Sequence, residues 1–260
     1  MTLFTKEELV EKLKVIRNRG WIANARTGND GGIGNTLEDL LDIEENNLPI
    51  PNAAEWELKT QRINTSSLTT LFHSEPSPRA AKLVPQVLLP LYGWPHKNAG
   101  GKYPADERSF RQTIHALARS DRGFGVIVNR EERKVEISFD AKCVASHHAD
   151  WLASVDQRVD LNELEPQPYW GFDDLAHKAG TKLLNCFYIK TAVKKIDKIE
   201  HFHYQQIFVL QKFDAGRFID AIENGLILVD FDARTGHNHG TKFRMKQDTL
   251  SRLYESVTQV

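Results

Sequence analysis

The sequence has few cysteines and no long hydrophobic run. Its 260 residues include two cysteines, Cys143 and Cys186, which are too few for a disulfide framework or a zinc-binding set. Because no apolar stretch approaches the roughly 18 residues of a membrane-spanning helix, we expect no membrane partner. The first residues also lack the basic-then-apolar order of a signal peptide. A cytoplasmic protein is therefore expected.

The chain also has almost no net charge, which at first argues against a nucleic-acid-binding protein. The formal net charge is −1, with 40% hydrophobic and 27% charged residues. The charges are unevenly distributed, because residues 76–134 carry eleven Lys and Arg against five Asp and Glu. Residues 38–57 carry no Lys or Arg and seven acids, namely Glu38, Asp39, Asp42, Glu44, Glu45, Glu55 and Glu57. An acidic cluster near a basic stretch fits a metal site beside a phosphate-binding surface, although ordinary solvated faces give the same pattern.

The first third of the chain predicts two helices and a strand. Residues 5–19 form an amphipathic helix with a Thr5–Glu8 capping box, and Gly20 ends it. A glycine-rich loop is expected at 28–34, which matches neither a phosphate-binding loop nor a convincing dinucleotide fingerprint. Thr36 is predicted to cap a second helix that places Leu37, Leu40 and Leu41 on one side. A proline-containing turn at 48–52 then leads into a strand around Glu57.

The remaining elements predict an α/β fold. A loop and another strand are expected at 60–72, and an extended, partly mobile segment at 74–111. The segments 125–128 and 135–139 predict a hairpin, and 183–189 and 226–231 predict strands. A capped helix is expected at 214–224, closed by Gly225, and a last helix at 246–257. Strands and helices alternate irregularly, which indicates a mixed β-sheet flanked by helices.

Glu57 and Lys59 form the most informative pair in the sequence. Side chains alternate between the two faces of a strand, so Trp56 and Leu58 are expected to point into the core. Glu57 and Lys59 should then emerge together on the other face, about 6 to 7 Å apart. A carboxylate and an ammonium group side by side suit a nuclease, in which one holds a divalent metal and the other addresses the phosphate or its water.

The segment 229–244 is dense in hydrogen-bond donors and acceptors. One interpretation is base-edge recognition, because Arg and His donate to guanine and Asp accepts from cytosine. The other is a polar hairpin loop, and the two weigh equally. A zinc site would need further ligands, and His147, His148, His201 and His203 have no convincing ligand spacing. The candidate residues are Asp230, Asp232, Arg234, His237, His239, Lys242 and Arg244.

The order and spacing of these motifs resemble one family, the MvaI/BcnI type II restriction endonucleases of the PD-(D/E)xK superfamily, related in fold to the mismatch-repair nicking enzyme MutH. The resemblance spans almost the whole chain, with a looser middle from about 75 to 180. The segments that carry it are GGIGNTLEDLL at 31–41, EENNL at 44–48, WELKT at 56–60, LTTLF at 68–72 and HNHGTKFR at 237–244.

The resemblance implies a monomeric, Mg²⁺-dependent enzyme with a MutH-like fold and two lobes that grip double-stranded DNA. It implies sequential nicking at a short pseudo-palindromic site of the CCNGG type, and a cognate DNA methyltransferase in the same restriction system. Glu38 would lie near the metal, Glu57 would bind it and Lys59 would be the catalytic lysine. Arg62, Ser67 and Thr69 follow the catalytic strand and would touch DNA. The recognition region would hold the candidates of 229–244. We expect a catalytic lobe at roughly 1–145 and a recognition lobe at roughly 146–260.

Asn52 departs from the family pattern, which has Asp five residues before the Glu of Glu-x-Lys. An amide offers one uncharged carbonyl oxygen where a carboxylate offers two oxygens and a charge. Because Mg²⁺ relies on one or two carboxylates, its binding at Asn52 and Glu57 should be severely weakened. The favoured explanation is a substitution made to trap uncleaved DNA, and the alternative is a natural variant that cuts slowly or not at all.

Three other functions are weighed against an active restriction endonuclease. The first is a sequence-specific DNA-binding protein that has lost catalysis, and the second is a MutH-like nicking enzyme of mismatch repair. The third, a metal-dependent hydrolase of small molecules, is disfavoured by the basic segment and by the lack of a His-rich metal set.

Overall fold

The computed structural model describes residues 4–26, 32–43, 55–63 and 65–260. These residues form two compact units, each assembled from segments that are distant in sequence. Unit 1 comprises residues 1–69, 177–217 and 246–260, and unit 2 comprises residues 70–176 and 218–245. Each unit thus contains residues from both sides of position 145, where a single boundary between two lobes was expected.

Unit 1 is built on a five-stranded sheet. The strand order is β1 (Ile22–Ala23), β10 (Ile199–Phe213), β9 (Asn185–Ile196) and β2 (Glu57–Arg62), and β13 (Tyr254–Gln259) also pairs with β10. β9 and β10 form a long antiparallel hairpin, whereas β2 pairs with β9 in parallel. A parallel pair needs a crossover connection, and residues 70–176 of unit 2 lie in the sequence between these two strands.

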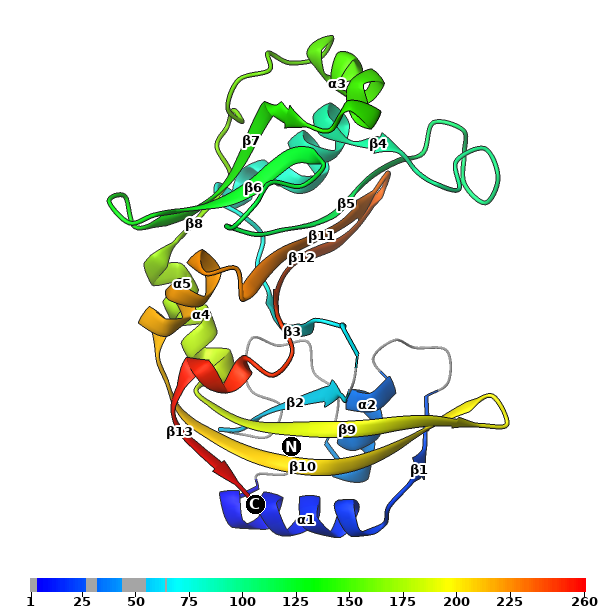
Figure 1. The fold of residues 1–260 in the computed structure, drawn as a ribbon, viewed down its shortest axis with the longest axis vertical. Coiled ribbons are helices and arrows are strands. Elements are labelled where there is room, and N and C mark those ends of the chain that lie inside the picture. The colour runs from blue at the N-terminus through cyan, green and yellow to red at the C-terminus, as the bar shows by residue number, and fades with distance from the viewer. Residues whose placement is uncertain (1–3, 27–31, 44–54, 64) are drawn as a thin grey trace. The chain divides into compact units, whose positions relative to one another are not determined.

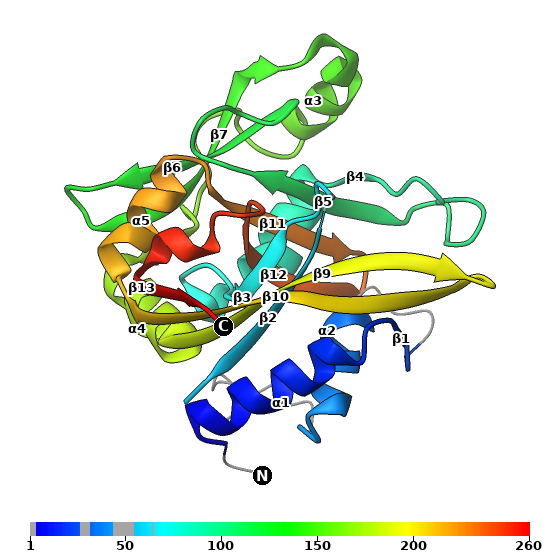
Figure 2. The ribbon, with the colours of Figure 1, turned by 60° about the horizontal axis from the view of Figure 1, so that its bottom comes forward.

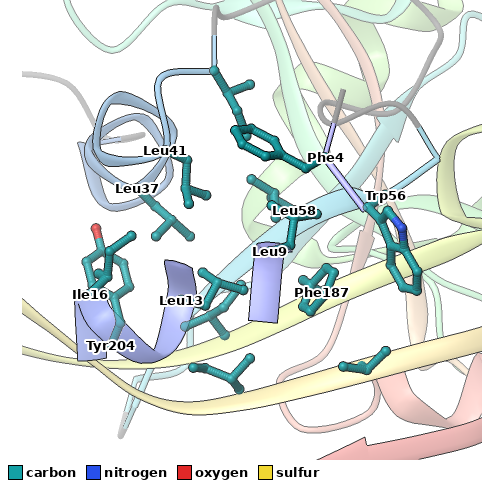
Figure 3. Close-up of a cluster of buried hydrophobic side chains, with 14 of the residues drawn as sticks. Phe4, Leu9, Leu13, Ile16, Leu37, Leu41, Trp56, Leu58, Phe187 and Tyr204 are labelled. Atoms are coloured by element: carbon teal, nitrogen blue, oxygen red, sulfur yellow. The ribbon is translucent and has the colours of Figure 1, made fainter. Parts of the chain in front are cut away.

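Helix α1 (Lys6–Asn18) covers one face of this sheet, as Figures 1 and 2 show. The predicted capping box is confirmed, because the Thr5 hydroxyl accepts from the Glu8 backbone and the Glu8 carboxylate accepts from the Thr5 backbone. The buried stripe of the helix is also as predicted. Its side chains pack against strand residues in the cluster of Figure 3, which includes Leu9, Leu13, Ile16, Trp56, Leu58, Phe187 and Tyr204.

Thr36 does not cap the second helix. Helix α2 spans Gly32–Leu40 and therefore begins four residues before Thr36, within the expected glycine-rich loop. The Thr36 side chain is buried, donates to Asn24 Oδ1 and accepts from the backbone N–H of Ala25, both at 3.3 Å. A tertiary contact thus takes the place of the predicted local cap.

The C-terminal residues form a strand where a helix was predicted. After a 3-10 turn at Leu250–Leu253, the chain continues as β13 and pairs antiparallel with β10. The apolar residues Leu250, Leu253 and Tyr254 have helical spacing, but they are buried by this turn and strand. Helix α5 (Ala215–Glu223) matches its prediction, because Asp214 accepts from the Arg217 backbone and Gly225 has a positive φ.

Unit 2 contains two further sheets. One has the order β3 (Thr69–His73), β12 (His237–Met245), β11 (Ile227–Arg234), β5 (Arg108–Ile114) and β4 (Trp94–Pro95). The other has the order β6 (Arg122–Asn129), β7 (Lys134–Val144) and β8 (Tyr169–Gly171), which confirms the predicted hairpin. Helix α3 (Ala149–Asp156) lies in this unit, and α4 (Phe172–Leu183) crosses from unit 2 into unit 1.

The segment 74–111 is more regular than predicted. It contains a 3-10 turn at Arg79–Ala81, a π-helix at Val84–Tyr92, and strands β4 and β5. The π-helix is anchored by buried Leu88 and by Tyr92, whose carbonyl accepts from the Trp151 indole at 3.1 Å. Residues 60–62, expected in a loop, continue β2.

None of the helices in the described ranges is long and apolar enough to cross a membrane.

Candidate functional site

Glu57 and Lys59 lie on one face of β2, opposite the core residues Trp56 and Leu58. The predicted pairing is confirmed, with Lys59 Nζ 2.7 Å from Glu57 Oε1. The two side chains are not equally exposed, however, because that of Lys59 is 15% exposed and that of Glu57 is 2% exposed. Figure 1 shows that this face of the sheet turns toward α4, away from α1. Glu57 is therefore a buried carboxylate with an ammonium partner.

Lys182, in the last turn of α4, is a third member of this site that the sequence analysis missed. Its Nζ lies 3.4 Å from Glu57 Oε2. That oxygen is buried and makes no hydrogen bond to a described residue. A buried carboxylate oxygen of this kind has the chemistry of a ligand for a hard divalent cation. Lys182 is more than 120 residues from Glu57 along the chain, so no local pattern links the two.

Two neutral groups line the same buried region. Burial raises the pKa of the Cys186 thiol, and the negative charge of Glu57 raises it further. Cys186 lies directly opposite Glu57 in the β2–β9 register. Burial likewise raises the pKa of Tyr254. Both raised pKa values favour the protonated, neutral form of the two groups at neutral pH.

Gln61 continues the face of Glu57 and Lys59 and ties the C-terminal segment to β2. Its Oε1 accepts from the Tyr188 hydroxyl and, at 3.2 Å, from the Asp248 backbone. Lys190 Nζ lies 2.5 Å from Asp248 Oδ1. This network fixes the strand that carries the Glu57–Lys59 pair.

The other two predicted catalytic residues are Asn52 and Glu38. Asn52 lies outside the described residues. Glu38 is half-buried on α2, which packs against β2 in unit 1. Its predicted position near a metal stays a prediction based on the family resemblance.

The residues expected to touch DNA after β2 fall in three settings. Arg62 points to the face opposite Glu57 and donates twice to the Glu200 carboxylate, at 2.8 and 2.9 Å. Ser67 is exposed and accepts from the Gln247 amide at 3.1 Å. Thr69 is buried at the start of β3. Ser67 is thus the most accessible of the three.

The recognition candidates of β11 and β12 share one face of the unit 2 sheet. Strand alternation places Val229, Phe231 and Phe243 in the core, so the polar residues between them point the other way. The register places Asp230 opposite Lys242 and Leu228 opposite Arg244. The sheet therefore gathers the candidates Asp230, Asp232, Arg234, Lys242 and Arg244 on one polar face.

The charged residues of this polar face are mutually paired. Asp230 accepts from the Thr113 hydroxyl at 2.7 Å and from Arg244 at 3.3 Å. Asp232 lies 3.3 Å from both Arg111 and Lys242. Arg111 and Thr113 come from β5, and sequence analysis missed them because β5 pairs with β11 across more than 100 residues.

His237 and His239 extend this face at the exposed end of β12. Their rings are stacked 5.4 Å apart with an interplanar angle of 11°. Arg234 is held by Glu107 at 3.0 Å and lies over the Tyr103 ring. A small pocket beside them is lined by His96, Tyr103, Ser109, Arg111, Asp232, Ala233, Arg234 and His239. The segment is thus a strand hairpin that displays polar groups, and its role in base-edge recognition stays a prediction.

Two of the four histidines considered for zinc come together in unit 2. Asp121, His147 and His148 place one ligand atom each within 4.8 Å of one another. His147 Nε2 lies 3.9 Å from Asp121 Oδ2, and both side chains are exposed. This group belongs to a different unit from Glu57.

Comparison with known proteins identifies the family. The model of the MvaI/BcnI restriction endonuclease family matches residues 10–254. Individual curated sequences give no significant match. A solved structure described as a restriction endonuclease MvaI–cognate DNA substrate complex is similar to the chain, with 24% identity over 98% of this chain and 99% of that one and a TM-score of 0.77. Restriction endonuclease MvaI in the absence of DNA is also similar, with 24% identity over the full length of both chains and a TM-score of 0.54.

These structural similarities show a shared fold of mixed sheets flanked by helices. The family match covers nearly the entire chain and includes both the Glu57–Lys59 strand and the β11–β12 hairpin. The protein therefore belongs to the MvaI/BcnI restriction endonuclease family.

Proposed function

We propose that this protein recognises a short site in double-stranded DNA and carries a phosphodiesterase centre at Glu57 and Lys59. The observation that carries the proposal is the buried Glu57 carboxylate, which has Lys59 at 2.7 Å from one oxygen and Lys182 at 3.4 Å from the other, an oxygen that makes no hydrogen bond to a described residue. Restriction endonucleases typically use divalent metal ions. The family match and the similarity to a DNA complex support DNA as the substrate.

In this proposal Glu57 and the residue at position 52 would hold Mg²⁺. The bound ion would neutralise charge on the phosphate and lower the pKa of its water. Lys59 lies beside Glu57 Oε1, the oxygen next to the proposed ligand oxygen Oε2, where its ammonium group is able to orient the attacking water or to stabilise the charge that develops. Burial strengthens both interactions, because fewer water molecules screen them. Glu38 would support the metal from α2.

The polar face of β5, β11 and β12 is the proposed surface for base recognition. Its Arg and Lys side chains supply donors that suit guanine, and Asp230 and Asp232 supply acceptors that suit cytosine. Their mutual pairing fixes side-chain directions before DNA arrives, which favours specificity. A CCNGG-type site, a monomeric enzyme that nicks the strands in sequence, and a partner methyltransferase complete the proposal, on the strength of the family resemblance.

Asn52 favours a second candidate function, a sequence-specific DNA-binding protein that does not cleave. An uncharged amide in place of a carboxylate weakens Mg²⁺ binding. A MutH-like nicking enzyme is a further alternative, which would cut one strand only and require a repair partner.

One experiment separates these functions. The chain and its Asn52→Asp form are incubated with Mg²⁺ and supercoiled plasmid, and with labelled duplexes under EDTA to measure binding. We expect both forms to bind and the Asn52→Asp form to linearise plasmid, with the cut ends giving the recognition sequence on sequencing. Nicking without linearisation would favour the repair alternative. If reversion produces no cutting although both forms bind, the active-site assignment is wrong.

A further inference from the structure

Lys182 contacts Glu57, the buried carboxylate of the proposed active site, and lies on a different element from Lys59. Lys59 Nζ lies 2.7 Å from one oxygen of Glu57, and Lys182 Nζ lies 3.4 Å from the other. One carboxylate is therefore contacted by two ammonium groups, one on each oxygen. Lys59 comes from β2 and Lys182 from the end of α4.

The backbone around Lys182 is firmly anchored. Leu183 follows it with no exposed surface, and Cys186 begins the pairing of β9 with β2 directly opposite Glu57. The ammonium of Lys182 therefore lies near Glu57 because of the helix-to-strand connection, and the position is determined by the fold of unit 1. A long surface lysine without such an anchor would sample many positions.

The two lysines, and not the carboxylate, form the accessible part of the site. Their side chains are 15% and 16% exposed, whereas that of Glu57 is 2% exposed. The short contact of Lys59 already supplies a charge-assisted partner for Glu57. At 3.4 Å, Lys182 is more distant from the carboxylate, and an ammonium group has three donors with which to meet more than one anionic oxygen.

We propose that Lys182 is a second phosphate-binding lysine of this site, which contacts a backbone phosphate oxygen of DNA beside Glu57 and Lys59. This inference rests on the proposed function. A lysine on a flexible stem acts as a compact point charge and suits a phosphate oxygen whose direction is not fixed in advance. Each such contact releases counterions from DNA and so contributes to the salt dependence of binding.

The test measures duplex binding in EDTA at several salt concentrations for the unaltered chain, Lys182→Gln and Lys182→Arg. The matched control is Lys212→Gln, which removes the same charge from unit 1 at a side chain that is 72% exposed. We expect Lys182→Gln to bind about 5- to 10-fold more weakly and to lower the salt slope by about one. Lys182→Arg should keep most of the affinity, and Lys212→Gln should behave like the unaltered chain.

Thermal unfolding of each variant separates phosphate binding from a structural role. Lost affinity with an unchanged salt slope and a lowered unfolding temperature would indicate that Lys182 only stabilises Glu57, and would overturn the inference. Affinity and slope equal to those of Lys212→Gln would overturn it too, while leaving the proposed function intact. If the unaltered chain does not bind duplex DNA at any salt concentration, the proposed function fails and the inference fails with it.

Discussion

At the scale of single residues, Glu57 shows how burial determines the chemistry of a side chain. A carboxylate that is 1% exposed must have a cationic or hydrogen-bonded partner, because its desolvation costs several kcal/mol. Lys59 supplies that partner at 2.7 Å. The same burial keeps Cys186 and Tyr254 protonated, because it raises the pKa of both groups. Among these groups, Glu57 is the one with the charge to hold a cation.

Replacing Lys59 separates catalysis from binding. In the Asn52→Asp form, Lys59→Ala should reduce plasmid cleavage below detection, because the ammonium beside the attacked phosphate is gone. Duplex affinity should stay within about threefold, since many other contacts supply binding. Cleavage is measured by gel electrophoresis and binding by fluorescence anisotropy. A collapse of binding together with cleavage would mean that Lys59 maintains the structure of unit 1.

Arg244 is the residue with which to test base recognition. If it donates to a guanine, Arg244→Ala should cost about 1 to 3 kcal/mol for the preferred duplex and relax specificity at one base pair. Competition binding with single-base-pair variants of the preferred duplex measures this. An equal loss for every sequence would identify a phosphate contact instead. Asp230→Asn is the informative companion, because it weakens the 3.3 Å pairing that orients Arg244.

At the scale of elements, the Arg62–Glu200 pair links β2 to β10 across the intervening strand β9. The pKa of Glu200 is lowered because Arg62 donates two hydrogen bonds to its carboxylate. The resulting stability is fully present above pH 4.5, the ordinary Glu value, and is lost as the pH falls through the lowered pKa of the folded state. The pair therefore stabilises the sheet at neutral pH and not in strong acid.

Removing Arg62 should expose this pH dependence. Arg62→Gln should lower the free energy of unfolding by about 1 kcal/mol at pH 7, and the difference from the unaltered chain should shrink as the pH falls below about 4. Urea unfolding of both proteins at a series of pH values from 7 to 3 gives the loss of unfolding free energy at pH 7 and its decrease at low pH. Lys212→Gln serves as the control for loss of a surface charge. A difference that stays constant over this range would show that the ion pair contributes no stability.

Sequence patterns predicted those elements whose partners are local. The Thr5–Glu8 capping box and the 3.6-residue stripe of α1 depend on residues within one helix, and both are confirmed. The β6–β7 hairpin likewise depends on neighbouring residues. The prediction of a helix at 246–257 was wrong, because the spacing of apolar residues in this segment suits both a helix and the observed turn and strand β13. Pairing with β10, about 50 residues earlier, decided between them.

At the scale of the whole molecule, the chain crosses between its two units four times. Residues 70–176 of unit 2 lie in the sequence between the parallel partners β2 and β9, and residues 218–245 of unit 2 follow β10. Residues 246–260 then return to unit 1. The Glu57–Lys59 strand lies in unit 1, whereas the polar face of β11 and β12 lies in unit 2. The proposed catalytic and recognition residues therefore belong to separately packed units.

DNA binding should stabilise the folded protein in a salt-dependent way. A ligand that binds only the folded state at about 100 times its dissociation constant adds about 2.7 kcal/mol. The unfolding temperature of the protein should therefore rise by several degrees when the preferred duplex is added at about 50 mM salt. This increase should be smaller at about 200 mM salt. A scrambled duplex of equal length is the control. An equal shift with both duplexes would argue against sequence-specific recognition.

The sequence by itself determined the family resemblance, the position of the Glu57–Lys59 pair and the alternation that places both side chains on one strand face. Those features depend on order and spacing along the chain, which a sequence displays directly. Only the tertiary structure brought Lys182 and Cys186 to Glu57, placed Arg111 beside Asp232 and turned Arg62 to Glu200. Each of these contacts joins residues that are more than a hundred positions apart. Their free energy arises from burial and charge pairing in the folded chain, which no local pattern encodes.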